Sequence, residues 1–270
     1  MYIDTQLKNL IKGKRVAIIG PADYVNKELG EDHGKYLDES FDIVIRLNSL
    51  IHIENKEMEK YYGSKYNILF SSFWHLPNEL KEEYTECRYL NEKSYKNINK
   101  KTILFECYNR NLFQNIYNKY KETIDSADIF YGNSSREFYT ETINYMNSIE
   151  NINATPTTGS LAIIMVLLMN PKKLYVSGIT TYLDKTHFAY YDDYLTKNNK
   201  EIQDLAIERR DGNNVKVSEF FDGKTYNMNH NVTKDHPFLA EQKILKHLVT
   251  NKLIKVDKYL KELVKKCLRI

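Results

Sequence analysis

The chain of 270 residues lacks the features that mark several common classes of protein. Its three cysteines, Cys87, Cys107 and Cys267, are widely scattered, with no CxxC pair and no histidine at metal-ligand spacing, which argues against a zinc site and a disulfide framework. The net charge is only +3 and charges of both signs are interleaved, so we expect no nucleic-acid partner. No stretch reaches the ~18–20 apolar residues of a membrane span, and no charged leader precedes an apolar run. We therefore expect a cytoplasmic protein.

Two ligand-binding signatures are also missing. The segment Gly-Pro-Ala-Asp-Tyr at 20–24 follows the first apolar run, and it is not the GxGxxG fingerprint of an ordinary dinucleotide site. No Asp-x-Asp sequence occurs that could bind a metal-chelated diphosphate. The sequence therefore predicts no metal and no cofactor.

Five short apolar runs predict the strands of an α/β protein. They are RVAIIG at 15–20, FDIVIRLN at 41–48, YNILFSS at 66–72, TILFECY at 102–108 and ADIFYGNS at 127–134. Polar helical stretches separate them, one broken by Gly30 and Gly34 and one capped by Ser134 or Ser135. This alternating order is typical of a mostly parallel sheet covered by helices. We predict a single Rossmann-like domain over residues 1–270.

The most informative segment is TPTTGSLAIIMVLLMNPKKLYVSG at 155–178. A Thr-Thr-Gly-Ser turn opens a helix that is apolar on every side and leads into a strand ending at Gly178. The free N–H groups and positive dipole end of such a helix favour a bound anion, and phosphate is the obvious one. The alternative is plain N-capping by Thr157 or Thr158, with Gly159 serving only close packing.

Ligands of doubly wound sheets bind outside the carboxyl ends of the strands. Gly20 ends the first predicted strand, while Arg46 and Asn48 lie at the end of the second. We expect Gly20 and Asn48 to converge on one crevice with the turn formed by residues 157–160, and Arg46 can be interpreted as a site residue as well.

Residues 235–248, DHPFLAEQKILKHL, predict a further helix with a histidine at its start. Asp235 can cap this helix, Pro237 suits its first turn, and Glu241 lies behind His236. The dipole at a helix N-terminus favours the neutral form of histidine, and a ring nitrogen free near pH 7 is what a general base requires. The alternative is a histidine that merely occupies a cap.

Four segments, in their order along the chain, together resemble glycosyltransferase family 29, the family of the animal sialyltransferases. The first looks like the family's long motif and carries Gly20, Asp42, Arg46, Asn48, Gly63 and Lys65. The segment from 155 onward is similar to the short motif, a Pro-Ser/Thr-Thr-Gly turn followed by an apolar helix and a strand. HFAYYDDY at 187–194 looks like a His-Tyr-Tyr-Asp element, and HPFLAE at 236–241 fits a His-x4-Glu element.

This resemblance implies a GT-A-like variant of the Rossmann-like fold and a metal-independent, inverting sugar transfer. The sugar, sialic acid or a related keto-sugar acid, would pass from a CMP-activated donor to a glycan or glycolipid hydroxyl. The family's catalytic base corresponds to His236, and His187 is a second catalytic candidate. The expected donor-binding residues are Gly20, Pro21, Ala22, Asn48, Thr157, Thr158, Gly159, Ser160, Gly178, Tyr190 and Tyr191, supported by Arg46, Asp192 and Glu241.

The proposed chemistry also makes sense without the family. A departing nucleoside monophosphate needs stabilisation, which the hydroxyl and N–H groups of 157–160, with Tyr190 or Tyr191, could provide without a metal. The acceptor hydroxyl needs a base on the opposite face, and His236 would then give inversion. The alternative for Tyr190, Tyr191 and Asp192 is a solvated loop in a chain that holds 22 tyrosines.

The sequence departs from the family's pattern in three ways. The asparagine after the first glycine is Pro21 here, which removes an amide that could contact the donor. The cysteines that bridge the two motifs in secretory-pathway members correspond to Arg15 and Asn170, and His187 is separated from the tyrosines by two residues. Two alternatives therefore stay open: a glycosyltransferase with another nucleotide donor, and a catalytically silent nucleotide-binding module that recruits a partner.

Two further segments have predicted roles outside the crevice. The strongly polar residues 193–235 are too long for an ordinary connection, and we expect a lid or acceptor-binding insertion there. Residues 252–270 predict an amphipathic basic helix. Its apolar face would carry Leu253, Val256, Leu260, Leu263 and Cys267. That face would pack on the body or on a second subunit of a homo-oligomer, or it would bind an anionic membrane peripherally.

Overall fold

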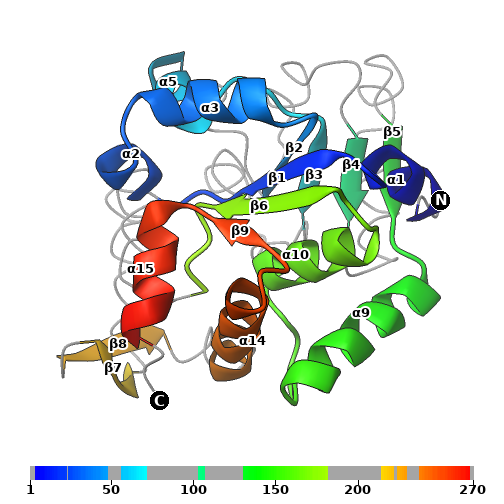
Figure 1. The fold of residues 1–270 in the computed structure, drawn as a ribbon. Coiled ribbons are helices and arrows are strands. Elements are labelled where there is room, and N and C mark those ends of the chain that lie inside the picture. Colours follow the sequence, from blue (N-terminus) through cyan, green and yellow to red (C-terminus); the bar gives the residue numbers. More distant parts are fainter. Residues whose placement is uncertain are drawn as a thin grey trace, which may run out of the picture.

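The computed structural model describes residues 4–22, 24–47, 56–71, 103–106, 130–181, 214–221, 224–229 and 237–267. Seven strands in these ranges form one sheet in the order β5-β4-β3-β2-β1-β6-β9, and every neighbouring pair is parallel (Figure 1). The strands are β1 (Arg15–Ile19), β2 (Ile43–Leu47), β3 (Ile68–Ser71), β4 (Ile103–Glu106), β5 (Phe130–Asn133), β6 (Lys173–Ser177) and β9 (Lys255–Val256). The predicted α/β class with a parallel central sheet is confirmed.

Each of the strands β1 to β5 lies within one of the five apolar runs that predicted them. In β1 only Arg15 is exposed, and every residue of β2 is buried. Continuous apolar runs are typical of parallel strands because helices cover both faces of the sheet.

Helices on the two faces of the sheet bury two separate core clusters. One cluster takes side chains from α1 (Asp4–Ile11), α9 (Arg136–Ile149), α10 (Thr158–Leu168), α14 (Phe238–Thr250) and α15 (Lys258–Cys267). The other takes them from α2 (Tyr24–Glu28), α3 (Asp32–Ser40) and α5 (Glu59–Tyr62), which follows the short 3-10 helix η1 (Lys56–Met58). In Figure 1, α3 and α5 lie above the sheet, and α9, α10 and α14 lie below it.

The side chains of β1 alternate between these two clusters. Val16 and Ile18 belong to the α10 side, whereas Ala17 and Ile19 belong to the α3 side. The helix α10 is buried around most of its circumference, as its apolar sequence predicts. It therefore fixes the position of its own N-terminus against the sheet.

The strand order reverses between β1 and β6. From β1 the chain adds β2, β3, β4 and β5 on one side, and it then crosses back to place β6 and β9 on the other side of β1. In open α/β sheets, ligands bind at the carboxyl ends of the strands beside such a reversal. A ligand is therefore expected at the carboxyl ends of β1 and β6.

Two helix boundaries differ from the sequence prediction. Gly30, with φ of 87°, lies between α2 and α3, but Gly34 lies inside α3 and does not break it. A Cβ at Gly34 would lie 2.0 Å from the carbonyl oxygen of Glu59, so this glycine allows α5 to pack closely. Pro237 is the N-cap of α14 and not a residue of its first turn.

The prediction of a single helix over 252–270 is wrong at its N-terminal end. Lys252 has a positive φ of 60°, and residues 255–256 form β9, which pairs with β6. The helix α15 begins only at Lys258. A two-residue strand has no periodicity of its own, so Leu253 and Val256 fitted the helical spacing by coincidence.

The apolar face of α15 is already buried in the body of the protein. Leu260, Leu263 and Val264 belong to the core cluster on the α10 side. This burial favours the packing alternative for the C-terminal segment over insertion of that face into a bilayer. In the part of the chain that the structure describes, no helix is long and apolar enough to cross a membrane.

The predicted insertion at 193–235 contains an antiparallel hairpin. Its strands are β7 (Asn214–Phe221) and β8 (Lys224–Asn229). The remaining residues of this segment lie outside the described ranges.

Candidate functional site

Two glycines bring the carboxyl ends of β1 and β6 into direct backbone contact. A Cβ at Gly20 would lie 2.2 Å from the carbonyl oxygen of Gly178, and a Cβ at Gly178 would lie 2.3 Å from the carbonyl oxygen of Gly20. Gly178 also has a positive φ of 71°. Any side chain at either position would force the two strand ends apart.

The N-terminus of α10 joins the same place through Ile179. Its Cγ1 atom would lie 2.7 Å from a Cβ at Gly20, and its Cγ2 atom 3.1 Å from a Cβ at Gly159. A Cβ at Gly159 would also lie 3.7 Å from Cδ1 of Leu47, the last residue of β2. Gly20, Leu47 and Gly159 thus lie close to one another around Ile179. Asn48, which the prediction placed in the same crevice, lies outside the described residues, so the crevice stays a prediction.

Thr157 is the N-cap of α10. Its φ and ψ of −66° and 154° are extended, and its Oγ1 accepts a hydrogen bond from the amide of Ser160 at 3.3 Å. The N-capping alternative is thus present in the structure, and so is the close packing of Gly159 on Ile179. Helix geometry leaves the N–H groups of Thr158 and Gly159 without an intrahelical partner, so capping leaves donors for an anion.

Glu241 connects the first turn of α14 to this N-cap. Its carboxylate accepts hydrogen bonds from the backbone amide of Thr157 and from the Thr157 hydroxyl, the latter at 3.0 Å. Thr157 Oγ1 also lies 3.1 Å from the hydroxyl of Ser160. In a capping box the glutamate that bonds to the N-cap amide comes from the same helix, whereas here it comes from another.

Burial dominates the electrostatics of Glu241. Its side chain is 1% exposed, and this desolvation raises its pKa to about 7, while the bonds from Thr157 and Ser160 oppose the rise. Because the carboxylate lies at the start of two helices, their dipoles stabilise its charge in part. Glu241 is a structural support of the 157–160 turn in this geometry.

The 20–22 turn has no free amide among its three residues. Gly20 donates its N–H to Ser177 O at 2.8 Å, and Ala22 donates its N–H to Gly178 O at 3.2 Å. Pro21 has no N–H. The predicted donor contacts of Gly20, Pro21 and Ala22 would therefore come from the shape and carbonyl groups of the turn.

Arg46 is buried on the α3 side of β2 and not beside α10. Its guanidinium donates to the carbonyl oxygens of Gly63 at 3.1 Å and Lys65 at 2.8 Å. Burial lowers its pKa to about 10, and Asp38 opposes this shift. Asp38 also binds the amides of Ser64 and Lys65, at 2.8 and 2.9 Å.

Most of the long-motif residues that the structure describes have structural roles, because they connect neighbouring elements. Lys65 donates its ammonium group to the carbonyl oxygens of Asp38 and Phe41 at the end of α3. Asp42 forms an ion pair with Arg15 at 2.7 Å, which joins the beginnings of β1 and β2. The bonds of Arg46 to the 63–65 turn hold the carboxyl end of β2, and the Arg15–Asp42 ion pair holds its beginning. Together they fix the position of Leu47.

Six residues of the predicted site lie outside the described residues. They are Asn48, His187, Tyr190, Tyr191, Asp192 and His236, and Asp235 is not described either. Their predicted roles stay predictions.

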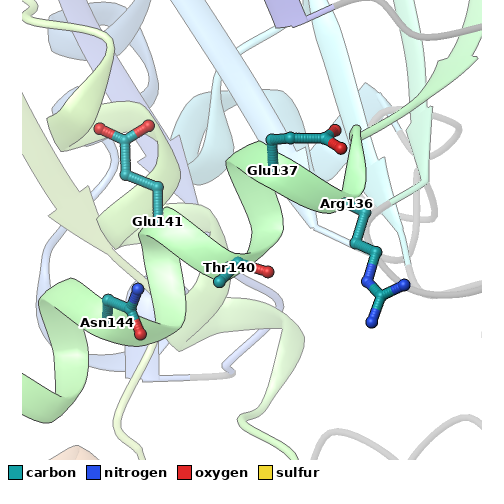
Figure 2. A pocket seen from close by; sticks show the side chains of 5 residues that line it. All are labelled: Arg136, Glu137, Thr140, Glu141 and Asn144. Atoms are coloured by element: carbon teal, nitrogen blue, oxygen red, sulfur yellow. The ribbon is translucent and has the colours of Figure 1, made fainter.

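A shallow hollow lies on the exposed face of α9, the helix that follows β5. The described side chains around it are Arg136, Glu137, Thr140, Glu141 and Asn144, all from one helix (Figure 2). It contains no residue of the predicted site. Across the described ranges, no group of three histidine, cysteine, aspartate or glutamate side chains is placed to hold a metal ion.

Sequence reasoning did not single out Ile179, Tyr24 or Asp257. Ile179 packs against Gly20 and Gly159. In the core, Tyr24 bonds to the Gly178 amide and Asp257 bonds to Tyr24. Ile179 could have been found as the residue after a strand-ending glycine. Asp257, directly before α15, carries the local signal of an N-cap, but its bond to Tyr24 joins residues 233 positions apart and had no local signal.

No protein-family model matches the chain, and no curated protein matches its sequence. The resemblance to glycosyltransferase family 29 therefore rests on the four sequence segments.

Proposed function

We propose that this protein is a sialyltransferase-like glycosyltransferase with a Rossmann-like fold of the GT-A-like type. It transfers sialic acid or a related keto-sugar acid from a CMP-activated donor to a hydroxyl of a glycan or glycolipid, with inversion. The donor is its substrate, and the proposed reaction uses no metal or other cofactor. Residues 193–235 would supply a lid or acceptor-binding insertion.

The observation that carries this proposal is that the ends of β1 and β6 and the start of α10 lie together where the strand order reverses. Gly20 and Gly178 are in contact there, and Ile179 joins them to Gly159 at the start of α10. Amides at a helix N-terminus, the adjoining hydroxyls and the helix dipole suit the phosphate of a departing nucleoside monophosphate. The segment that provides them is the same one that resembles the family's short motif.

The remaining residues would take the roles that the resemblance assigns to them. Thr158 and Gly159 would donate their amides to the leaving phosphate, with Tyr190 or Tyr191 adding a hydroxyl. His236, which directly precedes Pro237 in the chain, would take the proton of the acceptor hydroxyl as general base. Glu241 would act on the donor only through Thr157, because its carboxylate is already bonded to the amide and hydroxyl of that residue.

A second candidate is a nucleotide-binding module without catalysis. The amides of Gly20 and Ala22 are engaged within the protein, and Pro21 has none, so the 20–22 turn gives a donor no N–H group. A site with donors only at 157–160 could keep the nucleotide without orienting its sugar.

A nucleotide panel followed by a transfer assay tests the proposal. CMP is expected to raise the melting temperature without divalent metal, and chelator is expected to make no difference, because a ligand that binds only the native state stabilises it by mass action. Guanosine and adenosine nucleotides serve as controls. A shift seen only with uridine diphosphate plus manganese would contradict the family assignment.

The variant His236→Ala separates the two candidates. For an enzyme, transfer from CMP-sialic acid should fall by roughly 10²–10⁴ while CMP affinity stays close to that of the parent. His187→Ala is the comparison, because a residue that stabilises the leaving phosphate should lose affinity and rate together. A parent protein that binds CMP and transfers nothing to any glycan acceptor would support the silent module.

A further inference from the structure

A buried chain of hydrogen bonds joins the C-terminal segment to the crevice. The hydroxyl of Tyr24 accepts the N–H of Gly178 at 2.6 Å and lies 2.7 Å from Oδ2 of Asp257. The other oxygen of Asp257 accepts the N–H of Leu260 at 2.8 Å, in the first turn of α15. Tyr24 is 0% exposed and Asp257 is 4% exposed. The chain therefore runs entirely inside the protein.

The chemistry of the three groups fixes the direction of each bond. The Gly178 amide can only donate, so the Tyr24 hydroxyl accepts there and gives its own proton to the Asp257 carboxylate. Burial and the neighbouring carboxylate raise the pKa of Tyr24 well above its usual value, which keeps that proton in place. Loss of either side chain leaves a buried polar group without its partner, which is costly in the interior.

Packing holds the same chain in position. The rings of Tyr24 and Tyr259 stack with centroids 4.4 Å apart and planes inclined by 19°. Asp257 directly follows β9, whose Val256 pairs with Val176 of β6. Figure 1 shows α15 beside α2 at the same end of the sheet. The short helix α2 and the C-terminal segment thus support each other across the end of β6.

The backbone of Gly178, whose N–H bonds to Tyr24, also shapes the proposed site. Gly178 has a positive φ of 71°, and its carbonyl oxygen accepts the amide of Ala22 and lies close to Gly20. We propose that Tyr24 and Asp257 are positioning residues, which hold the Gly178 peptide and through it the 20–22 turn and Ile179 in the shape that binds nucleotide. Their role in nucleotide binding rests on the proposed function, whereas the relay to Gly178 does not.

Amide hydrogen exchange of the full-length protein tests the relay without any ligand. Asp257→Asn is the decisive variant, because Asp257 does not touch Gly178. Its exchange at the Gly178 amide should be about tenfold faster than in the parent, as expected when a buried bond opens more often. Thr142→Val is the control, since it removes a buried hydroxyl that donates to the Phe138 carbonyl oxygen within α9, outside this chain of hydrogen bonds. A change at Leu260 with none at Gly178 would overturn the relay and leave Asp257 as a helix cap.

Titration with CMP tests the consequence for the site. Tyr24→Phe and Asp257→Asn should weaken CMP binding by about 2- to 30-fold, and Thr142→Val should not. Parent-like binding by both variants would overturn the positioning role while leaving the proposed function intact. A parent that binds no nucleotide would instead remove the proposed function, and exchange at Gly178 would still decide the relay. If Tyr24→Phe does not fold, Asp257→Asn alone carries both measurements.

Discussion

The 20–22 turn and the 157–160 turn meet through Ile179 at the predicted crevice but use their backbone groups in opposite ways. In the 20–22 turn, the amides of Gly20 and Ala22 bond to carbonyl groups of residues 177 and 178. In the 157–160 turn, a helix begins and two amides have no partner inside it. The first turn gives the crevice its shape, and the second can offer hydrogen-bond donors to an anion.

The glycines at the two turns also differ in what a side chain there would meet. Gly20 and Gly178 are required because two backbones pass closer than a side chain would allow. The atoms nearest to a Cβ at Gly159 would be side-chain atoms of Ile179 and Leu47. Stability should therefore depend on the first pair, whereas ligand binding should depend on Gly159 and its neighbours.

Gly178→Ala is the strongest test of this difference, and we expect a loss of more than about 4 kcal/mol or failure to fold. The methyl group would meet Gly20 O at 2.3 Å on a backbone with positive φ. Gly13→Ala is the matched control, because Gly13 has the same φ of 71° but nothing within 4 Å of its Cβ position. It should lose only ~1–2 kcal/mol, the cost of the left-handed conformation alone. Urea denaturation would measure both, and equal losses would show that the backbone contact is unimportant.

Glu241→Gln should remove a pH dependence of stability worth up to about 3 kcal/mol. Burial raises the pKa of Glu241 to about 7, so between the unfolded value of 4.5 and 7 the native state binds more protons than the unfolded state. Stability from this group is therefore full at low pH and falls as the pH rises to about 7. In Glu241→Gln, the free energy of unfolding should depend less on pH over this range.

Urea denaturation from pH 4 to pH 8 would measure this effect as the difference between parent and variant. Glu137→Gln, at an exposed position on α9, is the control and should keep the parent's slope. A slope unchanged in Glu241→Gln would mean that the Glu241 carboxylate is ionised at lower pH than its burial implies.

Thr157→Val should cost about 1–2 kcal/mol of stability, because an N-cap hydroxyl is lost. Ser135→Ala is the control, because it also removes an N-cap hydroxyl: that of Ser135 caps α9 by accepting the Phe138 amide at 3.1 Å. Thr157→Val should be the more destabilised of the two in thermal unfolding, because its hydroxyl also bonds to the buried Glu241 carboxylate, and it alone should weaken CMP binding. Weaker CMP binding in both would trace the effect to general stability and not to the site.

Local sequence patterns predicted most of the sheet and one side of the crevice. β1 to β5 were found because strands buried on both faces read as apolar runs. Ser135 was found as one of two cap candidates, and it is the N-cap of α9. The 157–160 turn was found because hydroxyl side chains rarely open a buried helix without a role there.

The rest could not be predicted because it depends on contacts between distant residues. Glu241 bonds to Thr157 across 84 positions, and no local pattern distinguishes it from a surface glutamate. Arg46 was expected as a site residue from its place at the end of a strand, but pleating turns it toward the 63–65 turn. β9 was missed because two residues carry no period.

Gly159→Ala should change stability least, by less than about 1 kcal/mol, and still weaken nucleotide binding. Alanine favours the helix by roughly 0.5–1 kcal/mol over glycine. Against this gain, its Cβ would lie 3.1 Å from Ile179 Cγ2, a side-chain atom that can shift by a few tenths of an ångström. The new methyl group would stand beside the amide proposed to bind phosphate, and glycine is the residue that lets a backbone approach a ligand closely. Isothermal titration with CMP should therefore show clearly weaker binding than in Gly13→Ala, at equal melting temperature to the parent. If Gly159→Ala binds CMP as the parent does, Gly159 serves packing alone and the phosphate lies elsewhere along the crevice.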